Sequence, residues 1–387
     1  MSEINWLKVK SKFKKLKTVQ KYRKRIADKT ADLWTPLHLP TEEATYFFLL
    51  SDRARGKTNQ ILLLMMIAGY DYNKRIEYVR TTEDEIAPKN TGGLFDIICA
   101  HDYIDIITGG KYNTVQYSAK YWYYAKNEDG KITDIAEKPF MHLSCVRKYL
   151  DLKSGYNSDN SDLILYDEMI GKEEPEDFER YMQLQSTFFR MRQKCKVFFV
   201  SNTIKKDAQI FYEFTIAKPI EKMQQGDSKI IKNQLGTAFY VEILSSDKSQ
   251  TKKIVNSEYY GFDNPKLASI TGAHTWAFKQ YQHIPRLKQV EYITKNIYIY
   301  YHGKYYRCDI VSNELGICVY CHRATKTYTD SVIFTLEDIT DSRFIYALGQ
   351  SSKHLKFWKL LKANRFYFAD NEIGDAIERY FTTAKRT

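Results

Sequence analysis

The chain has 387 residues, which suggests two or three domains, and 43% of them are hydrophobic, which is enough for ordinary packed cores. Lysine and arginine outnumber aspartate and glutamate by 59 to 47, and the net charge of +12 favours a polyanionic partner such as nucleic acid, although an anionic membrane surface would also fit. Because the N-terminus is charged and no apolar run approaches the roughly 18 residues of a membrane span, the sequence predicts neither a signal peptide nor a transmembrane helix.

The first thirty residues predict a basic amphipathic helix. Eleven lysines and arginines lie between Lys8 and Lys29, where Asp28 is the only acid. This arm, residues 1–30, either packs on the first domain with a solvated basic face or contacts a nucleic acid or an acidic partner. Its apolar residues recur every three or four positions, as on one face of a helix: Trp6, Val9, Phe13, Leu16, Val19, Tyr22 and Ile26.

A phosphate-binding loop is predicted directly after an apolar strand at 45–50. The segment Ser-Asp-Arg-Ala-Arg-Gly-Lys-Thr, residues 51–58, departs from the pattern G-x-x-x-x-G-K-[ST] only where Ser51 replaces the first glycine. Backbone N–H groups of such a loop surround the phosphates, and the next helix, predicted at 57–69, directs its positive end at them. The alternative is a basic surface turn before a helix. The predicted nucleotide-binding residues are Ser51, Asp52, Arg53, Ala54, Arg55, Gly56, Lys57, Thr58 and Asn59.

The next segments extend this α/β pattern. A short strand is expected at 76–80, and residues 81–110 look helical and irregular. Between 113 and 135 two aromatic-rich arms flank the turn 127–130, which predicts a β-hairpin. Its lysines face either solvent or a polyanion; they are Lys120, Lys126 and Lys131.

Two further strands end in polar residues. A buried parallel strand is predicted at 163–168, after a polar loop at 154–162, and it ends in Asp167 and Glu168. A helix at roughly 175–192 leads to another buried strand, 197–200, which is followed by Ser201 and Asn202. Alternating strands and helices predict a parallel sheet, whose ligands bind at the carboxyl ends of the strands. The loop lysine, the two acids and the Ser-Asn pair can therefore meet at one nucleotide.

The residue types at these strand ends suit hydrolysis of ATP or GTP. Asp167 would hold Mg²⁺ from one side and Thr58 from the other, while Glu168 would orient and polarise the attacking water. Lys57 would reach the β- and γ-phosphates. Asn202 either senses the γ-phosphate or forms a turn. An arginine must also neutralise charge in the transition state, and the sequence offers Arg53, Arg55, Arg190 and Arg192.

The second half of the chain has a different character. Residues 1–245 are predicted as the ATPase domain, 246–288 as a linker with a small helical segment, and 289–387 as an α+β domain. Strands are expected at 296–301, 304–311, 316–322 and 331–335, and the last fifty residues look helical. Cys318, Cys321 and His322 spell C-x-x-C-H, but they lie in a strand-like run, so we interpret the cysteines as core residues rather than ligands of haem or zinc. Six scattered cysteines suggest a reducing cytoplasm.

Residues 44–205 resemble the DNA-packaging ATPases of tailed bacteriophages, close to the large-terminase ATPase and nearest to the motors of small Bacillus-phage-type podoviruses. The resemblance rests on Arg53 in the loop, on 78–80, on the Asp167-Glu168 pair and on 189–192 before the strand that ends at Asn202. It implies an α/β P-loop NTPase fold of the ASCE type with a mostly parallel sheet. It also implies that Arg190, with Arg192 as the second choice, enters the site of a neighbouring subunit, and that Ser201 and Asn202 couple hydrolysis to movement.

The resemblance also implies partners. They are ATP and Mg²⁺, double-stranded DNA, a ring of identical subunits, five in number, and the portal vertex of a prohead, with a structural RNA as a further partner. Such a protein would act in the host cytoplasm, docked transiently on the prohead, and would be absent from the mature virion. No membrane is expected.

The C-terminal domain would correspond to an RNase H-like nuclease. That chemistry needs several carboxylates around two metal ions, but the first strand, 296–301, has no acid and Asp309 is the only acid in the second. We therefore expect a vestigial domain without cleavage activity. The alternatives are an active terminase nuclease and an NTP-switched nucleic-acid-binding protein.

Overall fold

The computed structural model describes residues 3–24, 34–51, 56–152, 156, 161–170, 174, 176–190, 192, 194–202, 206, 208–244, 281–282, 291–294, 296–313, 316–337, 339–346 and 352–386. The chain divides into two compact units, Met1–Ala277 and Phe278–Thr387. The linker predicted at 246–288 lies outside the described residues, apart from 281–282. Within the described residues, no helix has the length and apolar character to cross a lipid bilayer.

The first unit is built on a ten-stranded sheet with the order β3-β4-β6-β2-β7-β8-β1-β10-β9, in which β5 also pairs with β4. The six strands from β6 to β10 along this order are parallel, which confirms the predicted mostly parallel α/β fold. The parallel strands are β1 (Tyr46–Leu50), β2 (Ile76–Arg80), β6 (Met141–Cys145), β7 (Leu163–Asp167), β8 (Lys196–Ser201) and β10 (Ala238–Ile243). The antiparallel additions are β3 (Thr114–Ser118), β4 (Tyr121–Glu128), β5 (Lys131–Ile135) and β9 (Ser228–Lys232).

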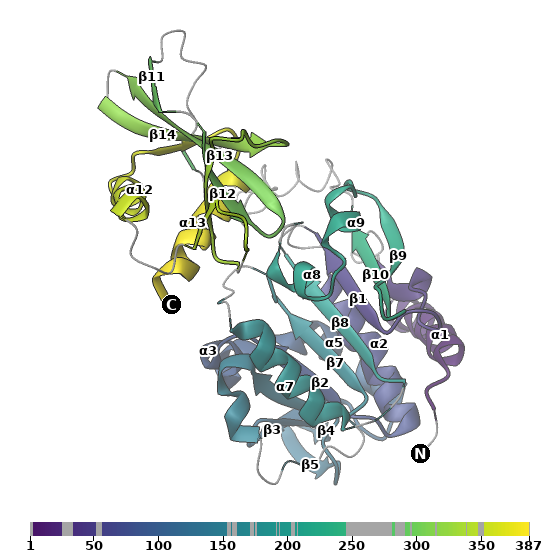
Figure 1. Cartoon of the computed structure of the whole chain (residues 1–387). Helices are drawn as coiled ribbons and strands as arrows, with labels where there is room; N and C mark the ends of the chain where they lie inside the picture. Colours follow the sequence, from purple (N-terminus) through teal and green to yellow (C-terminus); the bar gives the residue numbers. More distant parts are fainter. Residues whose placement is uncertain are drawn as a thin grey trace. The chain divides into compact units, whose positions relative to one another are not determined.

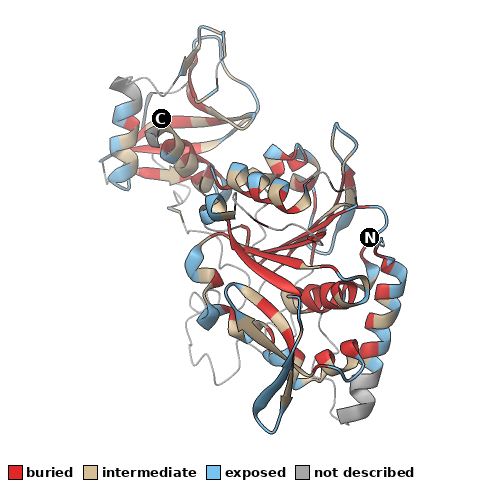
Figure 2. Ribbon diagram, turned by 90° about the horizontal axis from the view of Figure 1, so that it is seen from below, coloured by how far each residue is buried: buried red, intermediate tan, exposed pale blue. Residues whose placement is uncertain are grey.

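Two hydrophobic clusters cover the two faces of this sheet. Successive side chains of a strand point to opposite faces, so Phe47 of β1 belongs to one cluster and Phe48 to the other. The first cluster includes α1 (Trp6–Lys24) and α2 (Lys57–Tyr72), and the second includes α7 (Asp177–Phe189), α8 (Gln209–Glu213) and α9 (Ala217–Glu221). In Figure 1, α7 lies in front of the sheet and α2 behind it. Central strands are buried on both sides, which explains their continuous apolar runs (Figure 2).

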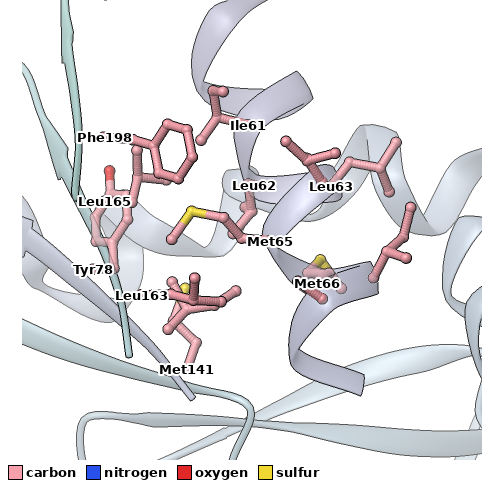
Figure 3. Close-up of a cluster of buried hydrophobic side chains, with 14 of the residues drawn as sticks. Ile61, Leu62, Leu63, Met65, Met66, Tyr78, Met141, Leu163, Leu165 and Phe198 are labelled. Atoms are coloured by element: carbon pink, nitrogen blue, oxygen red, sulfur yellow. The ribbon is translucent and has the colours of Figure 1, made fainter. Parts of the chain in front are cut away.

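Helix α2 is buried along most of its length. Ile61 and Met65 face Tyr78, Leu165 and Phe198 of three neighbouring strands (Figure 3). Because α2 starts directly after the predicted phosphate-binding loop, this packing fixes the helix N-terminus relative to the strand ends. The N-terminal arm is helical from Trp6 to Lys24, and its apolar residues between Trp6 and Leu16 that face the core are buried, as the sequence predicted for a helix packed on the first domain.

Several elements of the first unit differ from the sequence expectation. The hairpin predicted at 113–135 has the expected turn near Asp129 but is a three-stranded meander, because a second tight turn at Ala119 and Lys120, both with positive φ, separates β3 from β4. The irregular segment after β2 is a series of short helices: α3 (Glu83–Ile86), α4 (Pro88–Thr91), η2 (Gly92–Leu94), α5 (Asp96–Ala100) and α6 (Tyr103–Thr108). Helix α7 is shorter than the predicted 175–192, because Arg190 adopts a left-handed conformation with φ of 34°.

The second unit contains a seven-stranded mixed sheet with the order β16-β15-β12-β13-β14-β17, in which β11 also pairs with β13. The four strands predicted from the sequence are present, whereas three short strands were not predicted. The strands are β11 (Glu291–Thr294), β12 (Ile297–Tyr301), β13 (Lys304–Asn313), β14 (Gly316–Ala324), β15 (Val332–Thr335), β16 (Phe344–Tyr346) and β17 (Phe366–Phe368). Two helices in the expected C-terminal region complete the unit: α12 (Ser352–Lys362) and α13 (Asn371–Arg386).

The cysteines of the C-x-x-C-H segment lie in the core of this unit. Cys318 and Cys321 are completely buried in β14, which confirms their interpretation as core residues. The Sγ atom of Cys321 lies 3.2 Å from that of Cys308 on the adjacent strand β13. His322 instead lies 3.2 Å from Asp309. The RNase H-like assignment of this unit stays a prediction.

Candidate active site

Strand register brings the predicted site residues to one edge of the first sheet. Leu50, the last residue of β1, lies opposite Ser201 at the end of β8, and Asp167 at the end of β7 lies opposite Val200. Three neighbouring parallel strands therefore end at the same level, and the residues that follow them share one edge, as the sequence predicted.

The lysine of the loop is held among these strand ends. Gly56 has a φ of 73°, a left-handed conformation that glycine adopts without steric cost, and α2 begins at the next residue. Lys57 is buried, and its Nζ donates a hydrogen bond to Ser51 Oγ and another, of 3.2 Å, to Asn202 Oδ1. The four central loop residues lie outside the described residues, so their part in nucleotide binding stays a prediction; they are Asp52, Arg53, Ala54 and Arg55. Asn59 lies in the first turn of α2.

Asp167 and Thr58 form a cluster of oxygen atoms at the start of α2. Thr58 Oγ1 donates to Asp167 Oδ1 over 2.9 Å, and Tyr78 OH donates to Asp167 Oδ2 over 2.9 Å. Burial raises the pKa of Tyr78 and the charge of Asp167 raises it further, so the phenol stays protonated and acts as a donor. Hydroxyl and carboxylate oxygens are the ligands that Mg²⁺ prefers, so this pair fits the metal site that the sequence predicted.

Arg80 occupies the centre of the site, although the sequence predicted no role for it. Its Nη1 lies 2.8 Å from Asp167 Oδ2 and its Nη2 lies 2.9 Å from Glu168 Oε2. Burial opposes the charge of this guanidinium, but Tyr78, Asp167 and Glu168 raise the pKa of Arg80 above its ordinary value. The signal that could have identified it is its position, because Arg80 ends β2 next to the strand that carries the two acids.

Glu168 and Asn202 complete the link to the loop lysine. Glu168 follows β7 with a φ of 52°, an uncommon conformation for a residue other than glycine. Asn202 Nδ2 donates to Glu168 Oε1 over 3.0 Å, while the Oδ1 atom of the same amide accepts from Lys57. A single side chain thus contacts both the residue predicted to bind phosphate and the residue predicted to orient water.

The two arginines of the predicted finger lie at the opposite edge of the sheet. Arg192 Nη1 lies 3.0 Å from Asp162, directly before β7, whereas the candidate site begins at Asp167 at the end of this strand. Five residues of extended chain span about 16 Å, so Arg192 does not reach its own site. Arg190 is exposed and its Nη2 donates to the carbonyl oxygen of Tyr156 over 2.9 Å. Both arginines are thus held away from the candidate site at the end of β7.

A buried polar network lies beneath Arg190. Glu77 of β2 is completely buried and accepts from Arg75 Nε at 3.0 Å and from Tyr156 OH at 2.6 Å, and His142 Nδ1 lies 2.8 Å away. Burial alone would raise the pKa of this carboxyl, but His142, Arg75 and Ser161 lower it to about 2. The network ties β2 and β6 to Tyr156, whose carbonyl group holds Arg190.

Comparison with known proteins identifies the fold. No protein-family model and no curated protein matches the sequence. The Phi-28 gp11 DNA packaging motor is similar in structure, with a TM-score of 0.52 and 15% identity over 92% of this chain and 98% of that chain. The bacteriophage Phi-29 viral genome packaging motor assembly gives a TM-score of 0.52 and 16% identity over 92% of this chain and all of the other.

The chain has the fold of phage DNA-packaging motors. This likeness confirms the resemblance that the sequence predicted, as far as the fold is concerned. At this level of identity the fold does not carry the activity with it, so the chemistry must be argued from the residues of the site.

Proposed function

We propose that this protein is an ATP-driven translocase of double-stranded DNA that packages a phage genome into a prohead. The observation that carries the proposal is the convergence of Lys57, Thr58, Asp167 and Glu168 at the carboxyl edge of the parallel sheet, where Asn202 connects the lysine to the second acid. The fold shared with the two packaging motors supports it.

The site fits a magnesium-bound nucleotide. Lys57 and the N-terminus of α2 would bind the phosphates, because both present positive charge to the same point. Thr58 and Asp167 would hold Mg²⁺, which would supply charge neutralisation at the phosphates. Glu168 would orient the attacking water and accept its proton, and Ser201 and Asn202 would transmit the state of the nucleotide to β8. Arg80 would hold both carboxylates in place before nucleotide binds.

Transition-state charge would be neutralised by an arginine of a neighbouring subunit. Arg190 is the better choice, because Arg192 is already paired with Asp162. Arg190 lies at the far edge of the sheet, so it would have to act on the site of a second molecule. A head-to-tail contact of this kind forms a ring of identical subunits when it closes, and we propose a ring of five. The ring would dock on the portal vertex of the prohead in the host cytoplasm, with a structural RNA as a further partner, and would leave before the virion matures.

The second unit is proposed to be a vestigial nuclease-like domain that binds DNA, RNA or the portal. Asp309, the acid in its second strand, is buried and paired with Arg307 at 2.8 Å and with His322 at 3.2 Å. Burial raises the pKa of Asp309, but these two partners and their hydrogen bonds lower it below its ordinary value. A carboxylate held by two basic side chains is poorly placed to bind a catalytic metal ion. Cutting of plasmid DNA by the full chain with Mn²⁺ would instead establish an active terminase.

The experiment that tests the ATPase site compares Lys57→Ala and Glu168→Gln with the surface variant Glu43→Gln. Without a phosphate-binding lysine or a residue to activate water, we expect DNA-stimulated ATP turnover to fall at least about a hundredfold in both, with unchanged circular dichroism spectra. Glu43 is exposed and its variant should retain full turnover. Full activity of either site variant would overturn the assignment, and salt-sensitive DNA binding without directional movement would favour an NTP-controlled switch instead.

A further inference from the structure

Helix α1 carries an unusual charge pattern. Its 19 residues, Trp6–Lys24, include no aspartate or glutamate. Like charges three or four positions apart destabilise a helix, so such a sequence costs stability unless something compensates for it. The basic residues of the helix are Lys8, Lys10, Lys12, Lys14, Lys15, Lys17, Lys21, Arg23 and Lys24.

Part of this charge is compensated inside the first unit. Lys12 Nζ lies 2.5 Å from Asp71 at the end of α2, Lys10 Nζ donates to the carbonyl oxygen of Leu39, and Lys17 Nζ lies 5.5 Å from the centre of the Tyr103 ring. These lysines flank the apolar side of the helix, which is buried in the first cluster through Trp6, Val9, Phe13 and Leu16. The helix is therefore firmly attached to the unit, and one of its sides faces outward (Figure 2).

The outward side presents a row of lysine and hydroxyl side chains, of which Thr18 Oγ1 donates to the carbonyl oxygen of Lys14 over 3.2 Å. Lys8, Ser11, Lys15 and Thr18 are exposed and follow one another at helical spacings of three and four, with exposed Lys14 beside them. Lys8 and Lys15 are about 10 Å apart along the helix axis. Among the described residues, no acidic side chain pairs with Lys8, Lys14 or Lys15. Lysines that alternate with hydroxyl groups are the side chains that bind phosphates of a nucleic-acid backbone.

This row lies away from the candidate active site. Three contacts place α1 and the residues just before it: Lys10 with Leu39 before β1, Lys12 with Asp71 at the end of α2, and Glu3 with Lys194 before β8. All three belong to the edge of the sheet where the parallel strands begin, whereas the nucleotide site lies where they end. The row therefore does not serve the nucleotide site and is open to another anion.

We propose that Lys8, Lys14 and Lys15 of α1 form a binding surface for the phosphate backbone of double-stranded DNA. The choice of DNA among nucleic acids rests on the proposed function. A lipid surface fits less well, because amphipathic helices bind membranes through an exposed apolar face and the apolar face of α1 is buried in the core. The surface would hold DNA by charge alone, independently of base sequence and of bound nucleotide.

The test measures fluorescence anisotropy of a labelled DNA duplex at increasing salt, without nucleotide. The test variant combines Lys8→Gln, Lys14→Gln and Lys15→Gln, which keep the length and helix propensity of the side chains. The matched control makes the same change of charge at three exposed lysines elsewhere in the first unit: Lys138, Lys222 and Lys232.

Each lost phosphate contact should make the slope of log affinity against log salt shallower by about 0.9, or about 2.7 for three. Between 50 and 200 mM salt, the wild-type protein should therefore lose roughly 40-fold more affinity than the test variant. The control should keep a wild-type slope. ATP turnover without DNA should be unchanged in both, which separates failure of this proposal from failure of the ATPase site.

Three outcomes would overturn the proposal. In the first, the test variant keeps the affinity and the salt slope of the wild-type protein. In the second, the control loses as much DNA affinity as the test variant, which would show only an effect of net charge. Weakened binding to an RNA duplex with unchanged binding to DNA would assign the surface to RNA instead. Circular dichroism and thermal unfolding of each variant would establish that α1 remains folded and attached.

Discussion

Replacing Glu77 by glutamine would remove the carboxylate at the centre of the buried network beneath Arg190. In the folded protein Arg75, His142 and Ser161 lower the pKa of Glu77 from 4.5 to about 2 despite complete burial. A tenfold change in proton affinity is worth about 1.4 kcal/mol, so ionised Glu77 contributes about 3 kcal/mol to the free energy of unfolding at neutral pH. Removing one partner of a buried ion pair generally lowers the free energy of unfolding by about 3–5 kcal/mol, a range that includes this value.

The pH dependence gives the sign of this effect. Because the pKa is lowered in the folded state, the contribution is complete above the ordinary value of 4.5 and is lost as the pH falls towards 2. The variant cannot titrate at this position. We expect the free energy of unfolding of Glu77→Gln to be about 3 kcal/mol lower than that of the wild-type protein at pH 7. At pH 3 this difference in free energy should be smaller by about 2 kcal/mol.

Urea unfolding followed by circular dichroism measures both quantities, with Glu43→Gln as the exposed control that should stay within about 0.5 kcal/mol of wild type. The reasoning would be wrong if Glu77→Gln were as stable as wild type at pH 7, or if the difference between them did not depend on pH. Since Tyr156 also holds Arg190, the variant should additionally reduce DNA-stimulated ATP turnover.

Two further predictions concern charges at the two edges of the sheet. Arg80→Met would leave Asp167 and Glu168 without their guanidinium partner, so thermal unfolding should show a loss of about 2–3 kcal/mol in the free energy of unfolding. MgCl₂ alone should partly restore this stability. An equal response of wild type and variant to Mg²⁺ would contradict this prediction. Arg190→Ala should abolish ATP turnover, and mixing it with Lys57→Ala subunits should restore part of it, because each subunit supplies the group that its neighbour lacks. Absence of any recovery in the mixture would argue against an arginine that acts between subunits.

The sequence specified the local elements of the site because these depend on residues close together in the chain. An apolar strand, a glycine before Lys57 and a following apolar helix predict a phosphate-binding loop, and an apolar run ending at Asp167 predicts a buried strand, which is β7. The rule that ligands bind at the carboxyl ends of parallel strands then grouped these residues correctly. The meander after β3 was less predictable, since its second turn uses positive φ at Ala119 and Lys120, residues that rarely form such turns.

Sequence by itself determined the fold class, the strand ends and the buried face of α1, because periodicity and turn chemistry are local properties of the chain. Only the tertiary structure decided which strands are neighbours. The order β6-β2-β7-β8-β1 brings together segments distant in sequence, and it places Arg80 beside Asp167, Glu77 beside His142, and Arg192 far from the candidate active site of its own chain. Electrostatic energy depends on distance between charges in space, so these pairs, and the pKa values that follow from them, could not be predicted from local patterns.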